Sequence, residues 1–177
     1  MPFSSKEGKY TTRTWISEKA DTINQVLDIG AGSGTYINLL KYKQPILKHA
    51  TWIGVEAWEP YIEQYKLLEK YDKIISSDVR LIDFNQFSNI DLVILGDILE
   101  HMSKDDAIKL IDILIEKSSY ILISIPIIHF PQGEEFGNPF EAHIKDDWSH
   151  DEVISTFKKY IKKFEVNKTI GIYWLEK

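Results

Sequence analysis

Cysteine is absent from this 177-residue sequence. The chain can therefore form no disulfide, no zinc–thiolate site and no thiol nucleophile. Long apolar runs are absent as well, because every hydrophobic stretch is interrupted before the roughly 18 residues that suggest a membrane-spanning helix. No early segment joins a basic start to a long apolar run, as a cleaved signal peptide does. We therefore expect a cytoplasmic protein that does not enter a membrane.

A dense basic segment is also missing, and the formal net charge is −6. We interpret the four clustered lysines near the end as the solvated face of a late helix: Lys158, Lys159, Lys162 and Lys163. An acidic chain gains little from the phosphate attraction that drives non-specific nucleic-acid binding, so we expect no nucleic-acid partner. The length fits a single domain over residues 1–177, acting as a monomer or a homodimer.

Short apolar runs rich in β-branched residues alternate with longer runs of helical period. The runs that predict strands are Gln25–Ile29, Thr51–Val55, Lys73–Ser76, Leu92–Leu95, Tyr120–Ile125, Phe164–Lys168 and Ile172–Leu175. Helices are expected over Thr11–Ala20, from the glycine loop to about Tyr42, from Glu59 onward, and after the capping residues Ser103 and Ser149. In the helix after Glu59, one apolar face is expected to contain Tyr61, Ile62, Tyr65 and Leu68. This alternation is typical of an α/β domain in which helical crossovers join parallel strands.

The region from about residue 126 to residue 148 predicts a long loop. Loops of this length are uncommon in compact domains and are often functional, so we expect a lid or substrate loop. Aromatic and acidic side chains are interleaved in it, among them Phe130, Phe136, Phe140 and Trp148. Two interpretations stay open: a lid over a polar or cationic molecule, or a hydrophobic cluster beneath the loop.

The strongest local pattern is Val26-Leu-Asp-Ile-Gly-Ala-Gly-Ser-Gly34, in which an apolar strand leads directly into three glycines. Glycines permit a sharp turn and let a ligand approach the backbone, and the following helix offers free N–H groups. A dinucleotide fingerprint requires G-x-G-x-x-G, but here the third glycine comes one position early. Asp28 would repel a pyrophosphate but suits an ammonium group. S-adenosylmethionine (SAM) has an α-ammonium and no phosphate, so the loop favours SAM over a nicotinamide dinucleotide.

Two further acids follow predicted strands. Glu56 ends the second one, where an acid can accept hydrogen bonds from both ribose hydroxyls. Asp78 follows the third one, where it can accept a hydrogen bond from an adenine amino group while Val79 or Leu81 packs on the ring. Because open α/β sheets bind ligands at the carboxyl ends of their strands, these acids predict a nucleoside site.

Taken together, several pieces of the sequence resemble the class I SAM-dependent methyltransferases, in order and spacing, from about residue 24 to residue 126. The pieces are Val26–Gly34, Gly54–Glu56, Ser77–Val79, Asp91–Asp97 with Leu99–His101, and Ile121–Pro126. The resemblance implies a three-layer Rossmann-like sandwich with a mostly parallel seven-stranded sheet and a reversed, here abbreviated, last strand. It implies SAM as the cofactor, with these residues around it: Asp28, Gly30, Ala31, Gly32, Gly34, Glu56, Asp78, Val79, Gly96 and Asp97.

The segment Gly96–His101 contains Asp-x-x-Glu-His, which resembles the same segment of many small-molecule methyltransferases. The Asn/Asp-Pro-Pro-aromatic motif of DNA amino-methyltransferases is absent. We therefore expect methyl transfer from SAM to an oxygen or nitrogen atom of a small polar acceptor. Two alternatives stay open, namely a protein methyltransferase or partner-dependent subunit, and a non-catalytic SAM-binding module.

Oxygen and nitrogen acceptors usually lose a proton during methyl transfer, and histidine is the natural base near neutral pH. His101 follows the fourth predicted strand, close to the expected methyl donor, and His143 lies in the long loop, so these two are our catalytic candidates. A structural hydrogen bond at His101 and a solvated position for His143 remain alternatives. His129, Glu141 and His143 lack a complete metal-ligand pattern, so no metal site is expected.

Overall fold

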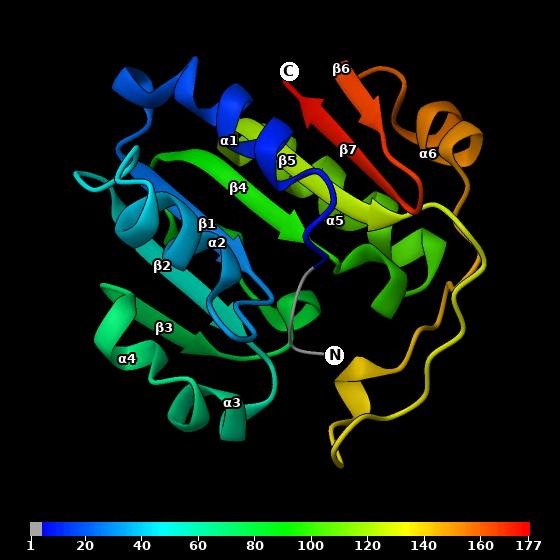
Figure 1. The fold of residues 1–177 in the computed structure, drawn as a ribbon, viewed down its shortest axis with the longest axis horizontal. Coiled ribbons are helices and arrows are strands. Elements are labelled where there is room, and N and C mark those ends of the chain that lie inside the picture. Colours follow the sequence, from blue (N-terminus) through cyan, green and yellow to red (C-terminus); the bar gives the residue numbers. More distant parts are fainter. Residues whose placement is uncertain (1–4) are drawn as a thin grey trace.

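The computed structural model describes residues 5–177, in which a central sheet lies between two layers of helices (Figure 1). Within these residues seven strands form one sheet in the order β3-β2-β1-β4-β5-β7-β6. The strands are β1 (Gln25–Ile29), β2 (Thr51–Glu56), β3 (Lys73–Ser76), β4 (Ile90–Gly96), β5 (Ser118–Pro126), β6 (Ile161–Val166) and β7 (Ile170–Leu175). The first five are parallel, whereas β7 runs antiparallel to both of its neighbours. The predicted fold class, with its reversed last strand, is confirmed.

The reversed strand is of ordinary length. All six residues of β7 are buried, and they pair with β5 from Ile121 opposite Leu175 to Pro126 opposite Ile170. Strand β6 begins at Ile161, three residues before the predicted start at Phe164. The exposed Lys162 and the half-buried Lys163 interrupt the apolar pattern at this start, because β6 is an edge strand with one solvated side.

Two hydrophobic cores separate the sheet from its helices. The helices are α1 (Lys9–Ser17), α2 (Thr35–Ile37), α3 (Glu59–Gln64), α4 (Leu67–Lys70), α5 (Lys104–Lys117) and α6 (His150–Phe157). One core packs α1, α2 and α4 against a sheet face that contains the fully buried Trp52. The other packs α5 and α6 against the opposite face. None of the helices within residues 5–177 has both the length and the apolar character needed to cross a bilayer.

Side-chain caps begin the two longer helices of the second layer, as the sequence predicted. The Ser103 hydroxyl accepts a 3.1 Å hydrogen bond from the N–H of Asp106 at the start of α5. The Ser149 hydroxyl accepts a bond of the same length from Glu152 at the start of α6. Each cap satisfies one of the N–H groups that a helix leaves unpaired in its first turn. These caps therefore fix where the chain leaves the loops that precede the helices.

The helix predicted after Glu59 is divided in two. Lys66 adopts a left-handed backbone conformation with φ of 52°, which ends α3 and restarts the chain as α4. The turn resets the helical phase, so Leu67 is fully buried while Leu68 remains 72% exposed. The apolar face predicted to include Leu68 is therefore wrong at that residue.

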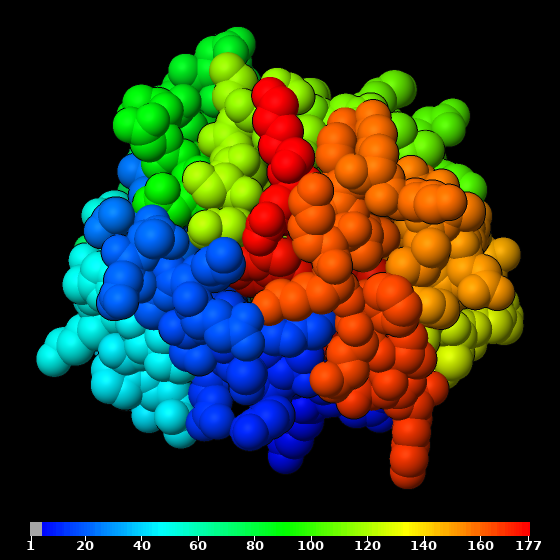
Figure 2. All heavy atoms as spheres, turned by 90° about the horizontal axis from the view of Figure 1, so that it is seen from above, coloured from blue at the N-terminus to red at the C-terminus, as the bar shows by residue number. Residues whose placement is uncertain are grey.

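The beginning and the end of the described chain lie side by side, as the blue and the red-to-orange atoms of Figure 2 show. Thr169, in the turn between β6 and β7, donates its N–H to the Glu7 carboxylate at 2.9 Å. Lys163 of β6 forms a 2.6 Å ion pair with Glu18 beyond the end of α1. The first contact places the N-terminal segment at the carboxyl end of β5, because Ile170, next to Thr169, pairs with Pro126.

Candidate functional site

The glycine loop after β1 requires glycine for its backbone shape. Gly30, Gly32 and Gly34 have φ angles of 72°, 49° and 76°, a region that side-chain-bearing residues rarely adopt. The N–H groups of Gly30 and Ala31 both donate to the Val55 carbonyl at 2.9 Å, which fixes the loop to β2. A Cβ atom on Gly30 would lie 1.9 Å from the Ile98 side chain. The loop is therefore both bent and closely packed.

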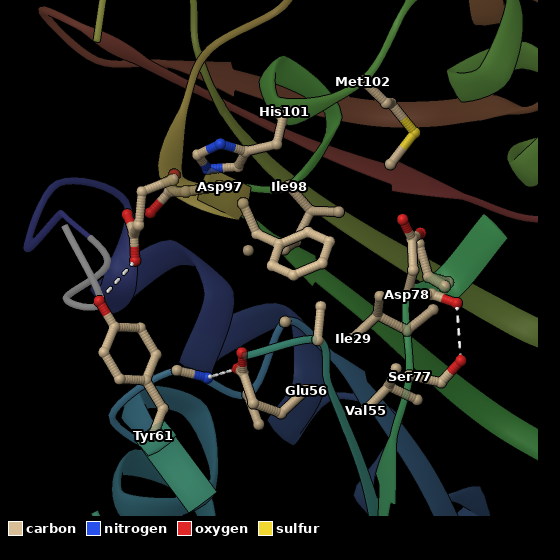
Figure 3. A pocket seen from close by; sticks show the side chains of 18 of the residues that line it. Ile29, Val55, Glu56, Tyr61, Ser77, Asp78, Asp97, Ile98, His101 and Met102 are labelled. Atoms are coloured by element: carbon tan, nitrogen blue, oxygen red, sulfur yellow. Dashed lines mark hydrogen bonds between the residues drawn. The ribbon is translucent and has the colours of Figure 1, made fainter. Parts of the chain in front are cut away.

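Glu56, at the end of β2, joins this loop to the next turn. One carboxylate oxygen accepts a 2.8 Å hydrogen bond from Gly32 N–H (Figure 3). The other accepts a 2.8 Å bond from Trp58 N–H. Burial raises the pKa of Glu56, and these two backbone donors act against that rise. A carboxylate has about four acceptor positions, so Glu56 can still accept a hydrogen bond from a hydroxyl group of a ligand.

A cleft of about 900 Å³, counting its opening to solvent, lies over the carboxyl ends of the parallel strands. The predicted site residues in its wall are Gly30, Ala31, Gly32, Glu56, Asp78, Val79, Gly96, Asp97 and His101. Asn138, Phe140 and Glu141 of the long loop close its far side. The structure therefore brings together residues that the sequence spreads from position 30 to position 141.

Asp28 does not line this cleft. Its side chain is 1% exposed beneath the glycine loop, where it accepts a 2.6 Å hydrogen bond from the Tyr71 hydroxyl. Burial raises the pKa of Asp28 to about 7. Gly34 also lies outside the wall, at the residue that precedes α2. A direct contact between Asp28 and an ammonium group stays a prediction. Because the side chain is buried beneath the glycine loop, the geometry favours an electrostatic effect on a ligand rather than a contact with it.

Asp78 lies in the cleft wall, but its carboxylate is occupied by Arg80. The guanidinium Nε lies 3.0 Å from each carboxylate oxygen, and Nη2 lies 2.5 Å from Oδ2. This side-chain contact is the main cause of the lowered pKa of Asp78. Arg80 was not among the predicted site residues. Its position two residues after the capping Asp78 is the sequence feature that could have indicated this contact. The adenine contact predicted for Asp78 therefore needs Arg80 to move aside.

The two hydrophobic candidates for packing on an adenine ring differ in position. Val79 is 8% exposed and lines the cleft next to Asp78. Leu81 is 80% exposed and is not part of the cleft wall. Val79, rather than Leu81, is therefore placed to contact a ring in the cleft.

A second cavity of about 870 Å³, again counting its opening to solvent, adjoins the cleft and shares Asp97 and His101 with it. Its other lining residues are Ser5, Glu100, Pro126, Ile128, Phe130, Gln132, His143, Thr169 and Ile170. No sequence pattern points to Ser5 or Thr169, because tertiary contacts such as the hydrogen bond from Thr169 N–H to Glu7 bring their segments together. The molecule thus has two adjoining hollows with one common wall.

Backbone hydrogen bonds hold the long loop against this common wall. The N–H groups of Ile144 and Lys145 donate to the Glu100 carbonyl at 2.9 and 3.0 Å. The N–H of His143 donates to the Gln132 carbonyl at 2.9 Å, which joins the two limbs of the loop. As a result the rings of His101 and His143 lie 4.8 Å apart, edge to face. The structure therefore brings the two catalytic candidates together.

Both imidazole rings direct one nitrogen at a backbone carbonyl. Nδ1 of His101 lies 3.2 Å from the Ala142 oxygen, and Nδ1 of His143 lies 2.5 Å from the Phe130 oxygen. A carbonyl oxygen only accepts hydrogen bonds, so each Nδ1 carries the hydrogen and each Nε2 keeps a lone pair. Burial, followed by the neighbouring His143, lowers the pKa of His101. The neutral ring is therefore favoured at this position.

The aromatic side chains of the loop divide between its surface and the core. Trp148 is 1% exposed and packs against Phe157 in the core beside α6. Phe136 is 84% exposed at the loop tip, and Phe130 and Phe140 are partly exposed. Neither of the two predicted interpretations therefore describes the whole loop.

Glu141, one of three loop residues considered as metal ligands, lies in the cleft wall away from the others. It accepts a 3.2 Å hydrogen bond from the hydroxyl of Tyr61, whose pKa burial raises to about 12. His129 instead faces Asp146 at 3.8 Å. Among residues 5–177, the group whose potential ligand atoms do converge is Glu100, His101 and His143.

Comparison of the sequence with protein-family models finds no match, and comparison with curated proteins finds none either. Solved structures do match the fold. The methyltransferase domain of bacterial CtHen1 is 17% identical, with a TM-score of 0.69 over 97% of this chain and 98% of that one. The N-terminal domain of EvdMO1, solved with SAH and D-fucose, is 12% identical, with a TM-score of 0.67 over 97% and 83%. A SAM-dependent methyltransferase from Archaeoglobus fulgidus is 14% identical, with a TM-score of 0.64 over 96% and 94%. These TM-scores show a common backbone architecture.

Proposed function

We propose that this chain, which has the fold of the class I SAM-dependent methyltransferases, binds SAM in the cleft and methylates a small polar molecule in the adjoining cavity. The observation that carries the proposal is the shared wall of the two hollows. Asp97 and His101 line both of them. A methyl donor in the cleft and an acceptor in the cavity would therefore meet at these residues.

The residues of the cleft fit SAM. The glycine loop exposes backbone where an amino-acid tail can approach, and Glu56 keeps acceptor positions for ribose hydroxyls. The wall also contains the carboxylates of Asp78 and Asp97. Carboxylates favour an ammonium group and hydroxyls over a pyrophosphate, which would meet like charge. This charge pattern supports SAM rather than a dinucleotide.

SAM supplies an electrophilic methyl group on a sulfonium sulfur. The chain's contribution is to align the acceptor atom with that methyl and the sulfur, and in-line alignment alone lowers the barrier considerably. As the new bond to oxygen or nitrogen forms, the carbon–sulfur bond breaks and S-adenosylhomocysteine (SAH) leaves. An unprotonated Nε2 of His101 or His143 can receive the acceptor's proton. The long loop lies against the junction, where the N–H groups of Ile144 and Lys145 hold it to the Glu100 carbonyl.

The lining of the second cavity supports a hydroxyl-bearing acceptor. Polar groups are contributed by Ser5, Asp97, Glu100, Gln132, His143 and Thr169. Ile128 and Phe130 add an apolar side against which a ring can pack. The EvdMO1 domain was solved in the presence of D-fucose, a small sugar. We therefore propose an oxygen atom of a sugar or similar metabolite as the acceptor.

The loop tip supports a second candidate, a methyltransferase that docks on a macromolecule. Phe136 is 84% exposed in a tight turn between Glu135 and Asn138. Further exposed apolar side chains of the same loop are Ile128, Phe130, Phe140 and Ile144. Exposed apolar patches often mark interaction surfaces, so a protein acceptor or partner is the alternative.

Calorimetry with purified protein tests the cofactor first. We expect SAM and SAH to bind with dissociation constants well below about 1 mM, and no heat at that concentration would reject the proposal. SAH release is then measured with a pool of monosaccharides and glycosides and, separately, with a protein extract. Turnover on the first pool supports the small acceptor, and turnover on the second alone supports the macromolecular candidate. Tight SAH binding without turnover on either pool would indicate a non-catalytic binding module.

A further inference from the structure

Glu100 is a buried carboxylate that faces two histidines. It is 2% exposed, and its Oε2 atom has no hydrogen-bond partner among residues 5–177. Buried polar groups without partners are costly and therefore rare. One potential ligand atom from each of Glu100, His101 and His143 lies within 4.8 Å of the others. A positively charged ion bound by these three side chains would give the buried Glu100 carboxylate the partner that it lacks.

The two histidines are oriented as metal ligands are. A ligating histidine usually donates its other ring N–H to a carbonyl or carboxylate, which fixes the tautomer and the ring. Both rings here have Nδ1 facing a backbone carbonyl, at Ala142 for His101 and at Phe130 for His143. This leaves each Nε2 as a lone-pair donor.

The backbone holds the three groups in place without help from a ligand. Glu100 and His101 are neighbours in the short helix that follows β4. The segment with His143 is fixed to them, because the next two N–H groups, of Ile144 and Lys145, donate to the Glu100 carbonyl. The site is therefore preorganised, which lowers the entropy lost when a ligand binds.

We propose that Glu100, His101 and His143 bind one divalent transition-metal ion at the junction of the cleft and the second cavity. Two imidazoles and one carboxylate suit Mn²⁺, Fe²⁺, Co²⁺ or Zn²⁺, whereas Mg²⁺ prefers a shell of oxygen atoms. Three protein ligands leave coordination positions open, as in catalytic metal sites. All three residues line the second cavity, so the open positions face it. This proposal replaces the metal-free site expected from the sequence.

The role of the ion rests on the proposed function. An ion at this place would bind a hydroxyl oxygen of the acceptor and favour its deprotonated form, which is the better nucleophile. The proton released from that hydroxyl would pass to solvent water at the opening of the cavity, and His101 and His143 would hold the ion rather than accept the proton. The second cavity would accordingly select molecules that present a metal-binding oxygen.

The test uses tag-free full-length protein treated with a chelator and then titrated with Co²⁺ and Mn²⁺ in the absence of SAM. We expect one equivalent of Co²⁺ to bind with visible absorption bands typical of imidazole ligation, and Mn²⁺ to compete for the same site. His143→Ala should weaken metal binding by about tenfold or more. His129→Ala is the matched control, because His129 lies in the same loop, is 69% exposed and is not one of the three residues. It should bind metal like the wild type.

SAH affinity and circular dichroism of His143→Ala show whether the variant is folded, and both should match the wild type. Glu100→Gln gives a second variant with the same size and should also lose metal affinity. No binding of either metal at about 1 mM, or equal affinity in wild type and His143→Ala, would overturn the metal site. Metal binding without SAH binding would instead reject the proposed function and leave the metal site standing.

Discussion

The Glu56 carboxylate accepts a hydrogen bond from the backbone N–H of Gly32, and this bond ties the end of β2 to the glycine loop after β1. Glu56, predicted to bind a ribose, and the glycine loop, predicted to bind an amino-acid tail, are therefore linked by a direct hydrogen bond (Figure 3). A change in either member alters the position of the other. Substitutions of Glu56 and of the glycine loop should consequently both affect ligand binding in the same cleft.

Glu56→Gln should weaken SAH binding by about tenfold or more and lower the free energy of unfolding by about 1–3 kcal/mol. Both partners of the carboxylate, Gly32 N–H and Trp58 N–H, are donors. An amide offers only one acceptor oxygen, so its NH₂ group must face one of these donors. Calorimetry and urea denaturation measure the two effects. The exposed Glu59→Gln is the control, and equal behaviour of the two variants would contradict the role of Glu56.

Gly30→Ala should abolish SAH binding and destabilise the protein by about 2 kcal/mol or more. The φ angle of 72° disfavours any side chain, and the new Cβ would lie 1.9 Å from Ile98. Gly133→Ala is a matched control, because its Cβ would meet no atom within 4 Å and its φ is not in the left-handed region. Thermal denaturation and SAH titration of both variants provide the comparison. A Gly30→Ala protein with wild-type affinity would show that the loop tolerates a displaced backbone.

Asp28→Asn should change how stability depends on pH. Burial raises the pKa of Asp28 from 3.8 in the unfolded chain to about 7, so the folded protein holds this proton more tightly. Stability from this group is full below the unfolded pKa and is lost as pH rises towards 7, by about 2–4 kcal/mol. Asparagine resembles the neutral acid and keeps an acceptor for Tyr71, so the variant should lack this loss. Urea denaturation between pH 4 and pH 8 measures both proteins, and parallel curves would place the titration elsewhere.

Phe136→Ala should leave the free energy of unfolding within about 0.5 kcal/mol of wild type, because the side chain is 84% exposed. SAH affinity should also be unchanged, since Phe136 does not line the cleft. The informative measurement is turnover on the acceptor pools. Unchanged turnover on a small molecule fits the small-acceptor proposal, whereas lost turnover on a protein extract would establish the tip as a docking surface.

The fold could be predicted because its local signals are strong and agree with one another. Alternating strand and helix patterns, two side-chain caps and a strand that runs into three glycines all indicate the same α/β layout. The sequence predictions fail where a single backbone angle or a tertiary contact determines whether a side chain is buried. The turn at Lys66 exposes Leu68, and the packing of α6 draws Trp148 from the predicted lid into the core.

The residues that line the cleft were largely predictable from the sequence, whereas those that line the second cavity were not. Glycines and strand-end acids cluster within short motifs, so sequence order alone places most of the cleft wall. The second cavity instead joins Ser5, Glu100, His143 and Thr169, which no local motif relates. The role of Arg80 also depends on side-chain geometry, because only the folded structure shows that it occupies Asp78.

The two hydrogen bonds that end on the Glu100 carbonyl divide the long loop into parts with different freedom to vary. Residues beside His143 are tied to the junction, whereas Gly133 and Gly137 border a tip with open space around both. Insertions or exchanged sequences at that tip would leave the positions of the imidazoles unchanged. On the proposed function, grafting new tips would therefore change which molecules reach the second cavity without moving His101 or His143.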